Sequence, residues 1–216
     1  SAMKYHSLNL QLNEELNDYK GMASSLNNIG MILKDRGNYE EAEKYYEKYL
    51  LNYRKSNDKK GEAVALNNLA NVYADEGNYA KAIQYYTKSL TIRETLKDEH
   101  GIASSWVNIG LIYTDMHEFD NAMECFNKSL RLNKKISNKQ GIAVSLNGIG
   151  NIYYEKGEIE KAMECYQNSL REYESIGNVQ GISNSLNSIG NMYFELNKPD
   201  TSLACYLNAL KHGELS

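Results

Sequence analysis

Asparagine side chains are the groups in this chain whose chemistry and spacing best suit binding another molecule. A primary amide offers donors and an acceptor together, so a row of amides can hold the backbone of an extended peptide whatever its side chains are. Two rows recur at the 40-residue period of the chain: Asn27, Asn67, Asn147 and Asn187, and then Asn71, Asn151 and Asn191. Paired members stand four residues apart and share a helix face. We predict a peptide clamp; the alternative is that the amides are merely solvated.

An acidic row follows on the same predicted face, with one member in each repeat: Asp35, Asp75, Asp115, Glu155 and Glu195. Five acids in register would favour a basic or amine-bearing ligand. The alternative, a charged edge that only keeps the chain soluble, stays open. The preceding position varies and is therefore where ligand selectivity would reside. Its last two members, Tyr154 and Phe194, would make the C-terminal half of the binding face more apolar.

Other recurring polar residues are interpreted as structural. The row Asn28, Asn68 and Asn108 suits packing and internal hydrogen bonds. Cys125, Cys165 and Cys205 recur once per repeat, and stacked repeats would hold them beyond the ~7 Å limit for a disulfide. Metal sites need ligands that lie close in sequence or converge in space. The histidines share no face with a nucleophile, and no glycine loop fits a phosphate. We therefore expect no enzyme activity, no cofactor and no metal.

A fixed sequence repeat predicts the secondary-structure elements that position these side chains. Glycines stand 40 residues apart at Gly21, Gly61, Gly101, Gly141 and Gly181, each inside similar text such as GMASSLNNIG and GIAVSLNGIG. No residue is inserted or lost across the five copies. A constant period of this size indicates an array of identical supersecondary units that stack on one another.

Each repeat shows two helical runs. Ala63, Leu66 and Tyr73 fall at helical spacing before a stop signal at Gly77, and a second apolar run follows. We predict two antiparallel helices of roughly 18 residues, joined by short turns. Because a glycine such as Gly61 in the first turn costs about 0.5–1 kcal/mol relative to alanine, its recurrence suggests close approach to the preceding helix.

Residue types that are typical of helix ends recur at these predicted helix boundaries. Side-chain oxygens suited to capping the first helix recur at Asp18, Asp58, Asp98, Asn138 and Asn178, and Asn38 and Asn78 would cap the second helix. Glycines suited to ending the first helix recur at Gly37, Gly77 and Gly157, with His117 and Asn197 in the other two repeats. The single proline, Pro199, falls in a predicted first turn, where a missing N–H does no harm.

These residues resemble the tetratricopeptide repeat family. Leu26, Ile29, Gly30 and Trp106 match its first helix, and the alanine and aromatic columns that begin at Ala42 and Tyr46 match its second. The period of 40 exceeds the family's usual 34, and the closing proline is absent. The longer unit is similar to that of G-protein-signalling modulator scaffolds and of bacterial sensor and regulator proteins. The resemblance implies an all-α, right-handed α-solenoid whose first helices line a concave peptide groove, with the Asn27 row facing it.

The frame divides the chain into a leading segment and five repeats. Residues 1–17 match the second helix of a truncated repeat, so we expect the chain to have been cut from a longer protein. The repeats are 18–57, 58–97, 98–137, 138–177 and 178–216. We predict that they form one continuous solenoid.

The bulk properties and the resemblance together set the expected function. A net charge of −4 disfavours a nucleic-acid or anionic-membrane binder, and no apolar run is long enough to span a membrane. The leading hypothesis is a scaffold that binds a protein or peptide segment, basic in character. The alternatives are the sensory region of a larger signalling protein and a self-assembly module that associates end to end. Unpaired thiols favour a cytoplasmic location.

Overall fold

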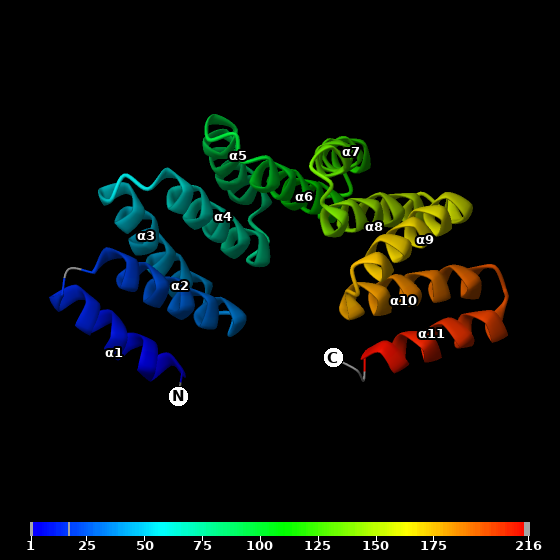
Figure 1. The fold of residues 1–216 in the computed structure, drawn as a ribbon, viewed down its shortest axis with the longest axis horizontal. Helices are drawn as coiled ribbons and strands as arrows, with labels where there is room; N and C mark the ends of the chain where they lie inside the picture. The colour runs from blue at the N-terminus through cyan, green and yellow to red at the C-terminus, as the bar shows by residue number, and fades with distance from the viewer. Residues whose placement is uncertain (1, 17, 214–216) are drawn as a thin grey trace. The chain divides into compact units, whose positions relative to one another are not determined.

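The structure, a computed structural model, describes residues 2–16 and 18–213. Within that part every regular element is a helix, as the repeat pattern predicts (Figure 1). In order they are α1 (Ala2–Glu15), α2 (Tyr19–Asp35), α3 (Tyr39–Lys55), α4 (Lys59–Asp75), α5 (Tyr79–Thr95), α6 (Glu99–Asp115), α7 (Phe119–Lys135), α8 (Lys139–Glu155), α9 (Ile159–Ser175), α10 (Val179–Glu195) and α11 (Pro199–Gly213). The predictions for Ser1, Asn17 and residues 214–216 lie outside the described residues.

The chain divides into two compact units, Ser1–Gly101 and Ile102–Ser216. In the first unit each helix from α1 to α5 packs against the next in sequence, and in the second unit the same holds from α7 to α11 (Figure 1). Helix α6 packs on α7, because the ring of Phe126 lies against Gly110. Each unit therefore consists of helix pairs laid side by side, in which the even-numbered helices from α2 onward are the first helices of their repeats.

Helix starts follow the predicted capping chemistry. The Asp58 side chain accepts a hydrogen bond from the Gly61 backbone N–H at 2.9 Å, and Asn178 does the same for Gly181 at 2.8 Å. Asp98 and Asn138 cap α6 and α8 in the same way. In the second helices Asn78 caps α5. Asn38 is the N-cap residue of α3 but makes no side-chain cap bond, so that detail of the prediction is wrong, and nothing in the structure explains the difference.

Helix ends use left-handed backbone where the sequence predicts it. Gly37, Gly77 and Gly157 have φ values of 76°, 81° and 73°, and His117 and Asn197 take the same conformation at 58° and 55°. The second helices end in the same way, which the sequence analysis missed. Four residues in this left-handed conformation end second helices. Three of them, with φ near 55°, are not glycine: Asn57, Lys97 and Ser137. Each such residue bears a steric cost that glycine avoids.

The first-turn glycines are required by close contact with the preceding helix, as predicted. A Cβ atom on Gly61 would lie 2.2 Å from the Tyr53 ring, and one on Gly181 would lie 2.3 Å from the Tyr173 ring. No side chain fits at those separations without displacing the tyrosine. The glycine row therefore sets the spacing between successive repeats.

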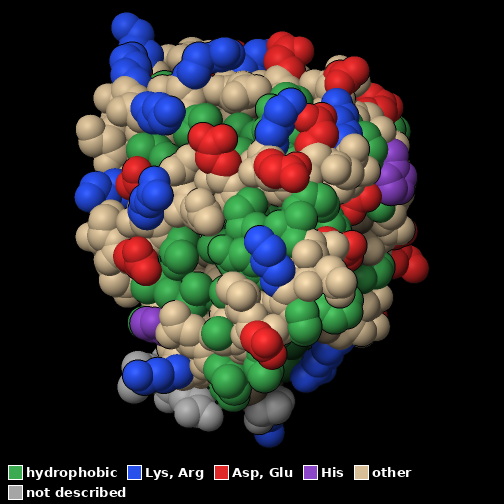
Figure 2. Space-filling model, turned by 90° about the vertical axis from the view of Figure 1, so that its right-hand side faces the viewer, with side chains coloured by type: hydrophobic (Ala, Val, Ile, Leu, Met, Phe, Trp, Pro, Cys, Tyr) green, Lys and Arg blue, Asp and Glu red, His purple; other side chains and the backbone are tan. Residues whose placement is uncertain are grey.

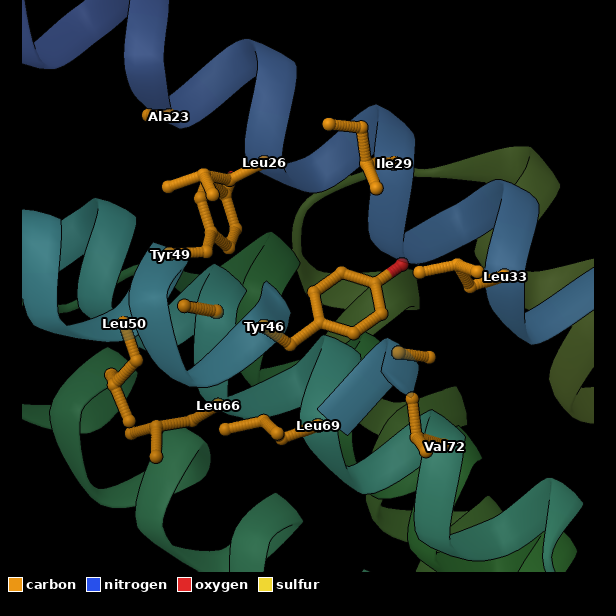
Figure 3. Packing of buried hydrophobic residues seen from close by; sticks show 12 residues of the cluster. Ala23, Leu26, Ile29, Leu33, Tyr46, Tyr49, Leu50, Leu66, Leu69 and Val72 are labelled. Atoms are coloured by element: carbon orange, nitrogen blue, oxygen red, sulfur yellow. The ribbon is translucent and has the colours of Figure 1, made fainter. Parts of the chain in front are cut away.

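Within each unit the hydrophobic core consists of clusters that take residues from successive helices. In Figure 3 the Tyr46 ring of α3 lies between Ile29 and Leu33 of α2 on one side and Leu69 and Val72 of α4 on the other. Leu69 and Ile29 are completely buried. Because this cluster joins one helix pair to the next first helix, the core of the unit extends from repeat to repeat and has no single centre.

Candidate functional site

The predicted binding residues all lie on first helices and keep contact with solvent. Asn27, Asn67, Asn71 and Asn147 are half-buried, and Asn151, Asn187 and Asn191 are exposed. The acids Asp35, Asp75, Asp115, Glu155 and Glu195 are exposed at the C-terminal ends of α2, α4, α6, α8 and α10. A first helix such as α8 thus carries Asn147, Asn151 and Glu155 at intervals of four, which places them along one helix face.

Tyrosine hydroxyls anchor the second asparagine row; Tyr86 and Tyr166 are buried and Tyr206 is half-buried. The Tyr166 hydroxyl donates to Asn151 Oδ1 at 2.7 Å, and the Tyr206 hydroxyl donates to Asn191 Oδ1 at 2.6 Å. Tyr86 and Asn71 make the same bond. Because each carbonyl oxygen accepts from a tyrosine hydroxyl, the NH2 group of the same amide points away from that hydroxyl. The bond therefore fixes the orientation of these amides, and at the exposed residues Asn151 and Asn191 it leaves the donors accessible to a partner.

The third repeat lacks both partners of this bond at once. Leu111 stands in the asparagine row and Phe126 in the tyrosine row, so neither an orphan hydroxyl nor an orphan amide results. The first repeat departs from this pairing, because Met31 stands in the asparagine row while Tyr46 stands in the tyrosine row. Burial raises the Tyr46 pKa to about 12. In the last four repeats the two columns change together, Asn with Tyr and Leu with Phe, and this signal is visible in the sequence alone.

The first asparagine row behaves differently in the two units. In the first unit Asn68 Nδ2 of α4 donates to Asn27 Oδ1 of α2 at 2.7 Å, which joins two successive first helices. In the second unit the residue equivalent to Asn68 is Ser188, whose hydroxyl donates to the Asn184 backbone oxygen instead. Asn147 Oδ1 is consequently buried without a hydrogen-bond partner among the described residues. The same column is thus satisfied internally at Asn27 and not at Asn147.

The acidic row also differs between the units. Lys34 Nζ lies 2.6 Å from Asp75 Oδ2 and 3.6 Å from Asp35 Oδ1, so one cation serves both acids of the first unit. The hydrogen bond to Asp75 is the main reason that the Lys34 pKa is raised. In the second unit no described cation forms an ion pair with Asp115, Glu155 or Glu195. Their charge remains available to an external partner.

Two aromatic side chains stand beside the unpaired acids of the second unit. Tyr154 is 37% exposed and Phe194 is 66% exposed, and each directly precedes an acid of the row. Figure 2 shows the side of the molecule on which α8 to α11 lie in Figure 1: hydrophobic side chains gather in its middle, with both signs of charge around them. The second unit therefore offers apolar and acidic groups together.

The cysteines are partly or fully buried, with Cys125 buried and Cys165 and Cys205 half-buried. Burial raises the pKa of the Cys125 and Cys165 thiols to about 11, which keeps both protonated and unreactive at neutral pH. Among the described residues no cluster of histidines, cysteines and acids is suited to hold a metal ion. Nor does the described part of the chain contain a helix of the length and apolarity needed to cross a membrane.

Comparison with known proteins places this geometry in context. The family model described as "Tetratricopeptide repeat" matches residues 21–95 and 101–175. Among solved structures, BtubC (BKLC) from P. vanneervenii is 17% identical, with a TM-score of 0.83 over 99% of this chain and 90% of that one. A search of curated protein sequences finds no significant match.

Two further solved structures share the fold over part of their length. A Rap protein complexed with Competence and Sporulation Factor is 16% identical, with a TM-score of 0.75 over 98% of this chain and 64% of the other. A signal-transduction ATPase with a tetratricopeptide repeat sensor from Pyrococcus horikoshii is 19% identical, with a TM-score of 0.75 over 89% and 31%. At these identities the likeness concerns the fold alone, and it confirms the predicted α-solenoid of helix pairs.

Proposed function

The chain belongs to the tetratricopeptide repeat family, and we propose that it is a protein-interaction module that binds an extended peptide segment along its first helices. The observation that carries this proposal is the anchoring of Asn151 and Asn191 by the hydroxyls of Tyr166 and Tyr206. An amide held with its donors outward loses little side-chain entropy when a peptide carbonyl binds. The Rap protein solved with a bound factor supports the proposal by analogy of fold.

The second unit is the better candidate for the bound segment. Its face on α8 and α10 combines the anchored amides with exposed Tyr154 and Phe194 and with two acids, Glu155 and Glu195, that form no ion pair with a described residue. Complementary charge and burial of apolar surface both favour a segment that carries basic and apolar side chains. We propose that the corresponding acids of the first unit contribute less, because Lys34 already neutralises them.

A selection experiment tests this function. Peptides selected on the folded chain from a random display library should be rich in lysine or arginine next to apolar residues. The variant Asn67→Ala/Asn147→Ala/Asn187→Ala should bind them at least about tenfold more weakly, a loss of roughly 1.4 kcal/mol. The matched control, Asn121→Ala/Asn168→Ala/Asn208→Ala, removes three asparagines from second helices of the second unit and should bind normally. Equal binding by both variants, with unchanged thermal stability, would exclude the first asparagine row from the clamp. Asn151→Ala/Asn191→Ala tests the tyrosine-anchored row in the same way, and normal binding by this variant as well would exclude the amide clamp.

A sensory role inside a larger protein is a second candidate. The signal-transduction ATPase described above is named for such a sensor, and this chain matches only 31% of it. On this alternative, peptide binding would control an output domain. The full-length gene tests it: a kinase, ATPase or DNA-binding domain next to the array supports the sensory role, and an array without any output domain contradicts it.

Self-association is a third candidate, favoured by exposed leucines on α11. Leu203, Leu207 and Leu210 are 57%, 58% and 60% exposed, and their spacing places them on one face. An apolar stripe of this kind favours contact with another apolar surface. Sedimentation over a range of concentrations tests it: a monomer at the highest concentration would remove this candidate.

A further inference from the structure

One side chain in each repeat packs over the first-turn glycine of the next, and its size varies. Tyr53 covers Gly61, Tyr173 covers Gly181, and the Arg93 side chain lies over Gly101. At Gly141 the corresponding residue is Asn133, which is much shorter. The amide of Asn133 contacts the glycine, but it cannot fill the space that a tyrosine ring or an arginine side chain occupies in the neighbouring repeats.

A hollow lies at this position in the second unit. Its volume is about 360 Å³, and its walls come from α6, α7 and α8; they include Ser104, Val107, Asn133, Asn138, Gln140 and Val144. Sites for small ligands usually range from roughly 300 to 1,000 Å³, so the hollow is large enough for one small ring. None of its lining residues is charged.

The next repeat shows what the fold packs at the same place. Ser169, Asn178 and Gly181 there correspond to Ser129, Asn138 and Gly141 here, whereas the two valines of the hollow correspond to Asn147 and Asn184. Tyr173 stands in place of Asn133; it is 6% exposed and lies directly over Gly181. The space above the first-turn glycine therefore holds a phenol ring at Gly61 and at Gly181.

The polar wall of the hollow is held in place by hydrogen bonds. Asn133 Nδ2 donates to Ser129 Oγ at 3.0 Å, and Asn138 Nδ2 donates to Asn133 Oδ1 at 2.9 Å. Asn133 is only 2% exposed. The second N–H of the Asn138 amide and the amide of exposed Gln140 are groups to which a hydroxyl can bond. A preorganised wall of this kind lowers the entropic cost of binding.

We propose that the hollow over Gly141 binds a phenol ring from outside the chain, namely the tyrosine side chain of a partner polypeptide. The ring packs beside the Asn133 amide and against Val107 and Val144, and its hydroxyl bonds to the amides of Asn138 and Gln140. The chain itself supplies this group over Gly181 and omits it here. The site is separate from the asparagine rows of the proposed function, since it depends on Asn133 and Asn138, and either site can exist without the other.

Side-chain amide NMR signals test the proposal with blocked tyrosine, N-acetyl-tyrosinamide, as the probe. In the wild-type chain the probe should shift the signals of Asn133, Asn138 and Gln140. The phenylalanine analogue lacks the hydroxyl and should bind roughly three- to tenfold more weakly, the equivalent of one hydrogen bond. Free p-cresol forms a further arm. Binding of p-cresol without binding of the blocked tyrosine would reject a polypeptide as the source of the ring.

Two variants extend the test. Asn133→Tyr fills the hollow with the residue of the neighbouring repeat and should abolish the probe-induced shifts of the amide signals. If this variant does not fold, Val144→Trp closes the hollow from α8 and should have the same effect. Tyr173→Asn opens the equivalent space and should add a shift at Asn178. The proposal is overturned if the wild-type chain shows no shift at Asn133 and Asn138, or if a folded filling variant binds the probe as well as the wild type does.

Discussion

The α2–α4 face of the first unit and the α8–α10 face of the second use the same columns of the repeat but satisfy their polar groups differently. In the first unit Asn27 accepts from Asn68, and Lys34 pairs with Asp75. In the second, Asn147 Oδ1 is buried without a partner, and neither Glu155 nor Glu195 has an ion pair among the described residues. A shared backbone frame thus supports one face that is satisfied internally and one that is open to a partner.

The largest expected effect tests the frame that both faces share. Gly61→Ala and Gly181→Ala each place a Cβ atom within 2.3 Å of a tyrosine ring. Both should lower the free energy of unfolding by about 3 kcal/mol, the upper end of the overpacking range. Denaturant unfolding followed by circular dichroism measures the loss. A loss in only one unit would show that the repeats are not equivalent as scaffolds.

The next effect concerns the tyrosine anchors of the second asparagine row. Phe126→Tyr adds a buried hydroxyl that faces Leu111 and has no acceptor, so it should cost about 2 kcal/mol of stability. Adding Leu111→Asn supplies the acceptor that Asn151 provides for Tyr166 and should recover most of the loss. Thermal unfolding of the two single variants and the double variant gives the coupling energy. Purely additive effects would contradict the matched-pair account.

A smaller effect separates the two faces directly. Asn27→Ala leaves the Asn68 amide without its acceptor and should cost about 1 kcal/mol. Asn147→Ala removes an acceptor that has no partner and should leave stability unchanged or raise it slightly. Denaturant midpoints for the two variants measure the difference.

The reverse design provides the control for that pair. Ser188→Asn should give Asn147 the donor that Asn68 gives Asn27, with a gain of roughly 0.5–1 kcal/mol. The gain should vanish in the Asn147→Ala background. If Asn27→Ala and Asn147→Ala cost the same, the two faces do not differ in the way the hydrogen bonds indicate.

The smallest effect concerns the charge on the first face. Lys34→Met removes a partly exposed ion pair and should cost less than about 1 kcal/mol. Because the folded pKa of Lys34 is raised, its contribution is complete below the ordinary lysine pKa and is lost as the pH rises through the folded value. The stability difference between Lys34→Met and wild type should therefore shrink above about pH 10.4. A difference that persists at higher pH would contradict the ion pair.

Much of the fold was predictable because the repeat ties each helix to local signals. The caps at Asp58 and Asn178, the left-handed helix ends at Gly77 and His117, and the packing reason for Gly61 all follow from residues close in sequence. The placement of the site residues on first helices followed from the same frame. Their role in binding remains a prediction.

The partners of the site residues were not predictable in the same way. The bond from Tyr166 to Asn151 depends on how the second helix of a repeat is rotated against the first. The ion pair between Lys34 and Asp75, which are 41 residues apart in the sequence, depends on the distance between α2 and α4. Asn147 Oδ1 lacks a hydrogen-bond partner among the described residues because the Ser188 hydroxyl donates to a backbone oxygen of its own helix. Only the matched columns of Asn with Tyr and Leu with Phe offered a sequence signal.

The most direct measurement is NMR mapping of a peptide selected on the folded chain. The account predicts that the bound peptide shifts the amide signals of Asn147, Asn151 and Asn191 on α8 and α10, and that Glu155→Gln/Glu195→Gln weakens binding while Asp35→Asn/Asp75→Asn does not. Shifts centred on α2 and α4, or equal weakening by the two pairs of variants, would contradict the claim that the second unit carries the open face.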